Sequence, residues 1–192
     1  MRRNGFTFLE TIISITIFTV VIVAVYSAFN MGIKTWRRSK EQESLQKTRL
    51  AFLKMEKDIK NTFFFSGFKF TGGPEKIEFP LTVSGGPDNK GQVYKITYDV
   101  NTDEESGFSG LTRIQKIHSE DNEEVPKERE LLSSMKSIGF EYAYESEDSF
   151  TWQNNWTSEK LPSGVRISVE AEDTEEIYSK VIFLQQGKLG SE

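Results

Sequence analysis

The fold is decided by residues 1–33, MRRNGFTFLETIISITIFTVVIVAVYSAFNMGI, which begin with basic residues and end in a long apolar run. Residues 11–33 contain no charged side chain. At 1.5 Å per residue these residues would form a helix about 35 Å long, which exceeds the roughly 30 Å hydrocarbon core of a bilayer. Because lipid offers the backbone no hydrogen-bond partners, the segment must be helical there. The stretch therefore predicts one membrane-spanning helix.

The rest of the chain has the opposite character. The mean hydropathy of all 192 residues is -0.48, which excludes a protein with many spans. Residues 34–60 carry nine Lys and Arg against four Asp and Glu, whereas residues 61–192 carry thirteen against twenty-four. This acidic C-terminal body argues against nucleic-acid binding, because phosphate contacts need a positive face. The absence of cysteine excludes disulfides, thiolate metal sites and a thiol nucleophile.

One carboxylate, Glu10, stands at the head of the apolar block. A charged side chain inside a membrane helix costs on the order of 2.5 to 3.5 kcal/mol by insertion scales, so it usually has a partner. Three kinds of segment compete here: a cleaved secretory signal, an ordinary signal anchor and a prepilin leader. The secretory signal leaves Glu10 unexplained. A purely structural role, as a carboxylate at a helix N-terminus, would be worth about 0.3 to 1 kcal/mol.

The first residues resemble the leader of type IV pilin-like proteins, which has a basic part (Arg2, Arg3), Gly before the cut (Gly5), Phe after it (Phe6) and Glu at the fifth mature position (Glu10). Phe8 stands where many members have Leu. The resemblance implies that a membrane aspartic prepilin peptidase cleaves between Gly5 and Phe6, and that Phe6 is then N-methylated. It also implies that Glu10 pairs with the amine of a neighbouring subunit, so that two groups costly alone become tolerable together.

Charge alone does not fix the orientation of the span, because basic residues flank it on both sides. Arg2 and Arg3 precede it, and a second group follows it: Lys34, Arg37, Arg38 and Lys40. The pilin resemblance places the leader in the cytoplasm. It thereby predicts a single-pass protein of the inner (cytoplasmic) membrane with a periplasmic, extracytoplasmic C-terminal head.

The helix is expected to continue beyond the membrane, since no Pro or Gly lies between residues 33 and 66. A narrow apolar stripe at helical spacing follows, formed by Leu45, Phe52, Met55, Ile59 and Phe63. We expect it to pack on the sheet of the same chain, with a short coiled coil as the weaker alternative. The predicted organisation is a leader at 1–5, a membrane and filament-core helix at 6–33, an amphipathic helix at 34–62, and a β-rich head at 63–192 that forms one domain with 34–62.

Beyond residue 62 the apolar period changes to two, which is typical of half-buried strands. About seven strands are expected, at residues 63–70, 76–83, 94–100, 111–117, 138–144, 165–169 and 177–184. Residues 131–137 are expected to form a short helical turn. The tight connections favour an antiparallel meander in one or two sheets. The predicted fold class is α+β and pilin-like, with the long N-terminal α-helix packed on an antiparallel β-sheet head.

Residues 110–169 of the head contain a series of short motifs in a fixed order: Gly110-Leu111-Thr112-Arg113, Leu131-Leu132 before a strand with Phe140, the pair Trp152 and Trp156, and Leu161-Pro162 followed by Val165-Arg166. In these features the head resembles the minor pseudopilin J family of type II secretion systems. Many members have Pro after the second Trp, where this chain has Thr157. We expect the two tryptophans either to cover the sheet as part of a loop or to face a partner.

This second resemblance implies a structural subunit of the pseudopilus tip complex, which helps to initiate filament assembly and the export of folded proteins. The implied partners are the minor pseudopilins of the I and K types, the major pseudopilin, the inner-membrane assembly platform, the prepilin peptidase and the lipid bilayer, and no nucleic acid. Two alternatives stay open. One is a minor pilin of a type IV pilus or competence system, and the other is a signal-anchored extracytoplasmic binding domain.

No pattern indicates catalysis or a resident metal. His118 is the only histidine, so a Ser-His-Asp triad or a His-based metal site would rest on one unsupported residue. Four acidic clusters offer oxygens to calcium, at residues 103–105, 120–124, 145–148 and 170–176, but none has the spacing of an EF-hand loop. We expect no enzyme activity and no cofactor, with calcium as the alternative.

Overall fold

The computed structural model describes residues 7–82, 92–118, 125–146, 149–172 and 176–184. The chain separates into two compact units, Met1–Ser44 and Leu45–Glu192. The expected cleavage position, between Gly5 and Phe6, lies outside the described residues.

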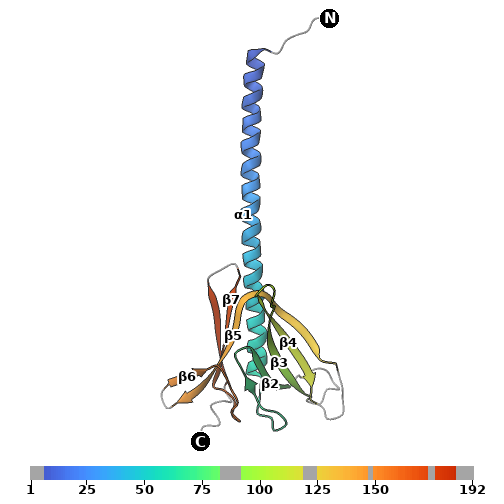
Figure 1. Ribbon diagram of the computed structural model, residues 1–192, viewed down its shortest axis with the longest axis vertical. Coiled ribbons are helices and arrows are strands. Elements are labelled where there is room, and N and C mark those ends of the chain that lie inside the picture. Colours follow the sequence, from blue (N-terminus) through green and yellow to red (C-terminus); the bar gives the residue numbers. More distant parts are fainter. Residues whose placement is uncertain (1–6, 83–91, 119–124, 147–148, 173–175, 185–192) are drawn as a thin grey trace. The chain divides into compact units, whose positions relative to one another are not determined.

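A single helix, α1 (Phe8–Lys60), occupies the first unit and the start of the second (Figure 1). Among the described residues it is the one helix long and apolar enough to cross a membrane. Its large apolar side chains in the first unit are exposed, as with Phe18 and Phe29 at 65% and 66%. Side chains of this kind suit a lipid or protein environment and not water.

α1 ends at Lys60 and not at residue 62 as expected. The side-chain Nδ2 of Asn61 donates to the carbonyl of Lys57 at 2.6 Å. The hydroxyl of Thr62 donates to the carbonyl of Pro80 at 2.9 Å. Lys57 and Lys60 in the last turn favour the negative end of the helix dipole. These contacts satisfy part of the helix C-terminus and turn the chain toward the sheet.

The buried face of α1 differs in part from the expected apolar stripe. Met55 and Ile59 are fully buried and belong to the core of the head, as expected. Leu45 is 43% exposed, and Phe63 lies beyond the end of the helix. The same face instead includes the polar residues Thr48 and Asp58, which are 3% and 2% exposed.

Within the described residues, the head forms one antiparallel sheet of eight strands, where the sequence had left one or two sheets open. Its order is β1-β2-β3-β4-β5-β7-β8, and β6 pairs with β5 off this path. The strands are β1 (Thr71–Gly72), β2 (Lys76–Thr82), β3 (Val93–Thr102), β4 (Ser109–Ile117), β5 (Lys127–Ser146), β6 (Ser149–Gln153), β7 (Gly164–Ala171) and β8 (Ile177–Phe183). Six of the seven expected strands are therefore confirmed in position, and the α+β pilin-like class is confirmed.

β5 explains why the sequence was compatible with two sheets. Its first half pairs with β4, and its second half pairs with β7 and β6 (Figure 1). The register shifts on both sides near Met135, and Ser134 adopts a left-handed φ of 57°. The expected helical turn at residues 131–137 is therefore wrong. This segment is the bend of a long strand, where a bulge redirects the sheet.

The expected strand at residues 63–70 is also wrong. The described backbone there has one isolated bridge, between Thr62 and Leu81, and pairs next at β1. Its phenylalanines pack on one another and on His118, with ring centroids of Phe65 and His118 5.3 Å apart. Aromatic residues are enriched in strands because they suit a half-buried surface, and here a loop supplies that surface.

Residues 73–75 complete the head by bridging β3 and β5. The amide of Phe140 donates to the carbonyl of Pro74 at 2.9 Å, and the amide of Val100 donates to the carbonyl of Glu75 at 2.8 Å. The Tyr142 hydroxyl donates to the carbonyl of Gly73 at 2.8 Å. At Gly72 a Cβ atom would clash with the Tyr142 ring, so only glycine fits there without a shift.

Candidate membrane, assembly and head-locking sites

The start of α1 forms a capping box around Glu10. The Glu10 carboxylate accepts hydrogen bonds from the backbone amide and the hydroxyl of Thr7, both at 2.9 Å. In return the Glu10 amide donates to the Thr7 hydroxyl at 3.3 Å. Ser or Thr at the N-cap with Glu three residues later satisfies helix-terminal donors reciprocally. The sequence contained this signal at Thr7, and the prediction used Glu10 alone.

Thr7 therefore gives the Glu10 carboxylate hydrogen-bond partners within its own chain. Gly5 and Phe6 lie outside the described residues, so this geometry concerns Glu10 and not the expected cleavage site. The hydroxyls of Thr16 and Thr19 donate to the carbonyls four residues earlier, at 2.9 and 2.8 Å. These bonds hide polar groups that would otherwise be costly in lipid.

A buried ionic network joins the end of α1 to the sheet. Asp58 Oδ2 accepts from Arg113 Nε on β4 at 2.7 Å and from the Tyr98 hydroxyl on β3 at 2.9 Å. Its other oxygen accepts from Lys54 Nζ at 3.0 Å. Arg113 also donates to the side chain of Gln115 at 2.9 Å. We call Asp58, Tyr98 and Arg113 the head lock.

The head lock is almost completely removed from water. Asp58 is 2%, Arg113 8% and Tyr98 0% exposed. Burial, together with the neighbouring charge of Asp58, raises the pKa of Tyr98 well above its usual range. Separation of Asp58 from Arg113 would leave an uncompensated buried charge, so a rotation of the helix out of register would carry a large free-energy penalty. It was not predicted, although Arg113 ends the Gly110–Arg113 motif.

A second, more exposed contact joins α1 to the opposite part of the sheet. Glu56 Oε2 lies 2.8 Å from Lys180 Nζ on β8, and Glu56 Oε1 lies 2.7 Å from Lys60 Nζ. The head lock and Glu56 thus attach one helical turn to β3, β4 and β8. Both contacts lie within the second unit.

Trp156 is part of the packed head. It is 5% exposed, and its indole N–H donates to the carbonyl of Lys160 at 2.9 Å. Its backbone pairs with Gly72 in both directions, at 2.9 and 2.7 Å. The segment before β7 is thereby attached to β1.

Trp152 lies on β6 and is partly exposed. The guanidinium of Arg166 on β7 stacks over its ring, 3.9 Å from the centroid. Arg166 also donates to Glu141 at 2.8 Å. The rings of Phe150 on β6 and Phe183 on β8 contact each other, and these side chains are 40% and 50% exposed. The strand pairing places both of them near Trp152 and Arg166. We call Phe150, Trp152, Arg166 and Phe183 the β6–β8 patch.

The candidates for metal binding or catalysis were His118 and the acidic clusters. His118 packs between Phe65 and Phe68. Asp103 accepts from the amides of Glu105 and Ser106, which lower its pKa and hold the β3–β4 turn. The cluster at 120–124 lies outside the described residues, as do residues 147–148 of the cluster at 145–148 and residues 173–175 of the cluster at 170–176. Within the described part of the chain no three His, Cys, Asp or Glu side chains are grouped to hold a metal ion.

These features define a class of protein: a membrane-anchored, pilin-like chain with a C-terminal β-sheet head. Residues 1–26 match the prokaryotic N-terminal methylation motif, which supports the leader resemblance. Residues 28–183 match the family described as type II secretion system (T2SS), protein J. The chain belongs to this family and has the features of a minor pseudopilin J, so both resemblances are confirmed. The family is one of structural pseudopilins and not of enzymes. No curated protein and no solved structure matches the chain.

Proposed function

We propose that this minor pseudopilin works in the tip complex of the pseudopilus, where it helps to initiate filament assembly and so the export of folded proteins. The observation that carries the proposal is the position of Glu10. It stands in the first turn of an apolar helix that continues into a T2SS protein J head. A carboxylate there is useful when helices from several subunits pack together.

The proposed mechanism is mechanical and needs no cofactor. Cleavage between Gly5 and Phe6 would free an amine next to Thr7, and Glu10 of one subunit would pair with that amine on a neighbour. Residues 6–33 would then move from lipid into a filament core, where apolar side chains remain covered. The head would stay outside the membrane and present its surface to other subunits.

We place the protein in the inner (cytoplasmic) membrane with an extracytoplasmic head. The partners proposed for it are the minor pseudopilins of the I and K types, the major pseudopilin, the assembly platform and the prepilin peptidase. The family match supports this assignment over a minor pilin of a type IV pilus or competence system.

For the head we propose that the β6–β8 patch, and Trp152 within it, faces a partner pseudopilin. Trp, Phe and Arg are the side chains that dominate binding energy at protein interfaces. Trp156 would act as the cover that holds the neighbouring loop. Trp152→Ala should then weaken co-isolation with the other minor pseudopilins while the head remains folded.

The decisive experiment is mass spectrometry of the mature N-terminus, followed by an assembly assay. A protein starting at methylated Phe6 supports the proposal, and an intact Met1 or a start near Ala28 overturns it. Glu10→Gln, which keeps the size but loses the charge, should be processed normally and fail to co-isolate with the other minor pseudopilins. Glu10→Asp is the matched control and should retain part of the assembly. Unchanged assembly of Glu10→Gln would contradict the pairing role.

A further inference from the structure

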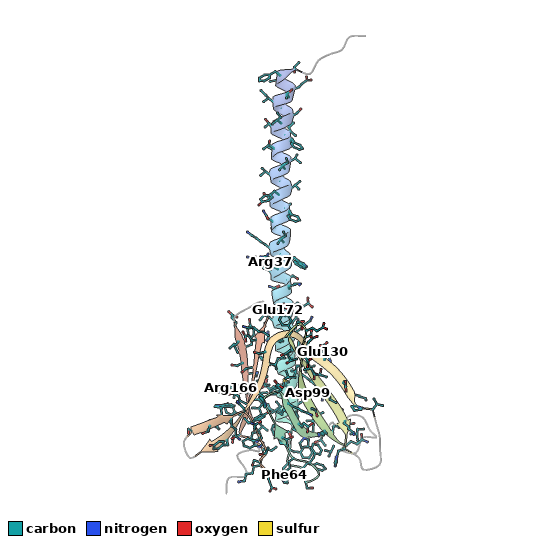
Figure 2. All side chains as sticks on the ribbon, viewed as in Figure 1. Arg37, Phe64, Asp99, Glu130, Arg166 and Glu172 are labelled. Atoms are coloured by element: carbon teal, nitrogen blue, oxygen red, sulfur yellow. The ribbon has the colours of Figure 1, made fainter. Side chains whose placement is uncertain are left out.

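A group of basic side chains follows the apolar part of α1 within the first unit. Lys34, Arg37 and Arg38 are spaced three and four residues apart and share one helix face, and all three are exposed. Arg37 is labelled on the helix in Figure 2. Among the described residues none of the three forms an ion pair with a carboxylate. We call Lys34, Arg37 and Arg38 the basic face.

The depth of the basic face follows from helix geometry. The apolar stretch ends at Ile33, and each residue adds 1.5 Å along the helix. The basic face therefore lies within about 8 Å of the end of that stretch. The polar headgroup layer on each side of a bilayer is about 5 to 7 Å thick. The three cations thus occupy the layer in which lipid phosphates lie.

Trp36 lies at the same level and marks the boundary. Its ring is 63% exposed, and Lys40 Nζ lies 4.8 Å from its centroid. Tryptophan is enriched at membrane–water interfaces because its ring is apolar and its N–H is polar. The ring would rest at the level of the lipid glycerol, at the same depth as the cations of the basic face.

We propose that the basic face binds the phosphate of an anionic phospholipid on the head side of the membrane. Arginine presents a planar fork of donors that matches phosphate. Two arginines and one lysine can therefore bind the phosphate of one headgroup together. The occupant is a lipid and not a protein, because the face continues directly from the apolar stretch at headgroup depth. In the proposed orientation these cations lie on the side where basic residues are usually scarce, so an anionic lipid would compensate for them. The inference rests on the proposed membrane insertion.

The test uses the full-length protein in vesicles of phosphatidylcholine with an equal fraction of phosphatidylglycerol. In one set the phosphatidylcholine carries bromine on its acyl chains, and in the other the phosphatidylglycerol does. Bromine quenches nearby tryptophan, and the Trp36→Phe protein supplies the background from the two tryptophans of the head. The Trp36 signal is the difference between the two proteins.

Each basic residue near an anionic surface raises the affinity by about fivefold, so brominated phosphatidylglycerol should quench Trp36 at least about twofold more than brominated phosphatidylcholine. The excess should vanish in Lys34→Gln/Arg37→Gln/Arg38→Gln. It should persist in Lys47→Gln/Arg49→Gln/Lys57→Gln, which loses the same charge farther along α1.

Three results would overturn the inference, and they can be told apart. Equal quenching by the two lipids in the unchanged protein removes the lipid preference but leaves the insertion intact. An excess that survives the first triple variant shows that other groups attract the lipid. No quenching of Trp36 by either lipid means that residues 11–33 are not inserted, which also contradicts the proposed function.

Discussion

Replacing Arg113 by Met should destabilise the head more than replacing a charged side chain of an exposed ion pair, such as Lys95. The substitution keeps the apolar stem but removes the guanidinium that lies 2.7 Å from Asp58. Asp58, 2% exposed, would keep the Tyr98 hydroxyl and Lys54 as partners. Lys54 is partly exposed and can compensate only in part.

The magnitude follows from the burial. Removing one partner of a buried ion pair costs about 3 to 5 kcal/mol, and the remaining contact with Lys54 argues for the lower end, about 3 kcal/mol. With a urea dependence of roughly 2 kcal/mol per molar for a domain of this size, the midpoint should fall by about 1.5 M. The assay is urea unfolding of the full-length protein in detergent, followed by tryptophan fluorescence, to which buried Trp156 contributes.

A variant without the whole head lock separates charge burial from packing. Asp58→Leu/Tyr98→Phe/Arg113→Met leaves no buried charge and no unpaired hydroxyl, so it should be more stable than Arg113→Met alone. Lys95→Met, which breaks an exposed pair with Glu78, is the control and should cost less than about 1 kcal/mol. The reasoning is refuted if Arg113→Met costs no more than this control, or if the triple variant is the least stable of the set.

Ser134→Gly should stabilise the head by up to about 1 kcal/mol because its φ is positive, whereas Ser179→Gly, at an exposed and regularly paired position of β8, should cost about 0.5 to 1 kcal/mol; equal urea midpoints for the two would exclude strain at Ser134. Burial raises the pKa of both Tyr98 and Tyr142, so each keeps its proton in the folded head but loses it above about pH 10 when unfolded. Stability should therefore fall as the pH rises above about 10, and ultraviolet absorbance should show Tyr98 and Tyr142 ionising only with unfolding; ionisation of these two side chains in the folded protein would contradict this. A chain that begins at Lys34 should be soluble and folded, since it keeps the whole compact unit Leu45–Glu192; an insoluble product would contradict the predicted organisation.

The sequence predicted the parts of the fold that depend on local pattern. The uncharged stretch predicted the membrane helix, and alternation predicted β3 and β7 to within a few residues. The predicted burial of Met55 and Ile59 on the helix was correct. Each of these signals is repeated over several turns or residue pairs, so no single contact can overturn it.

The errors lie where contacts distant in sequence decide the conformation. Residues 63–70 are rich in phenylalanine, which is common in strands, but a strand also requires hydrogen bonding to a neighbouring strand. In this segment the phenylalanine rings instead pack against one another in a loop. The sequence did not predict the burial of Asp58, because the neutralisation of its charge depends on Arg113, which is 55 residues away. The bend requires a left-handed backbone conformation at Ser134, and the sequence has no glycine at this position to indicate it.

The capping box changes the physical meaning of Glu10. A membrane carboxylate without partners would oppose insertion of the single subunit, yet here Thr7 supplies two donors from the same chain. These donors are neutral, so they satisfy the hydrogen bonding of the carboxylate but leave its charge uncompensated, whereas the amine of a processed neighbour would be a cation and would add Coulomb attraction. In the proposed filament the carboxylate would therefore exchange an adequate partner for a better one. The same residue would permit a stable pool of single subunits in the membrane and still favour assembly, which a carboxylate without Thr7 would not do.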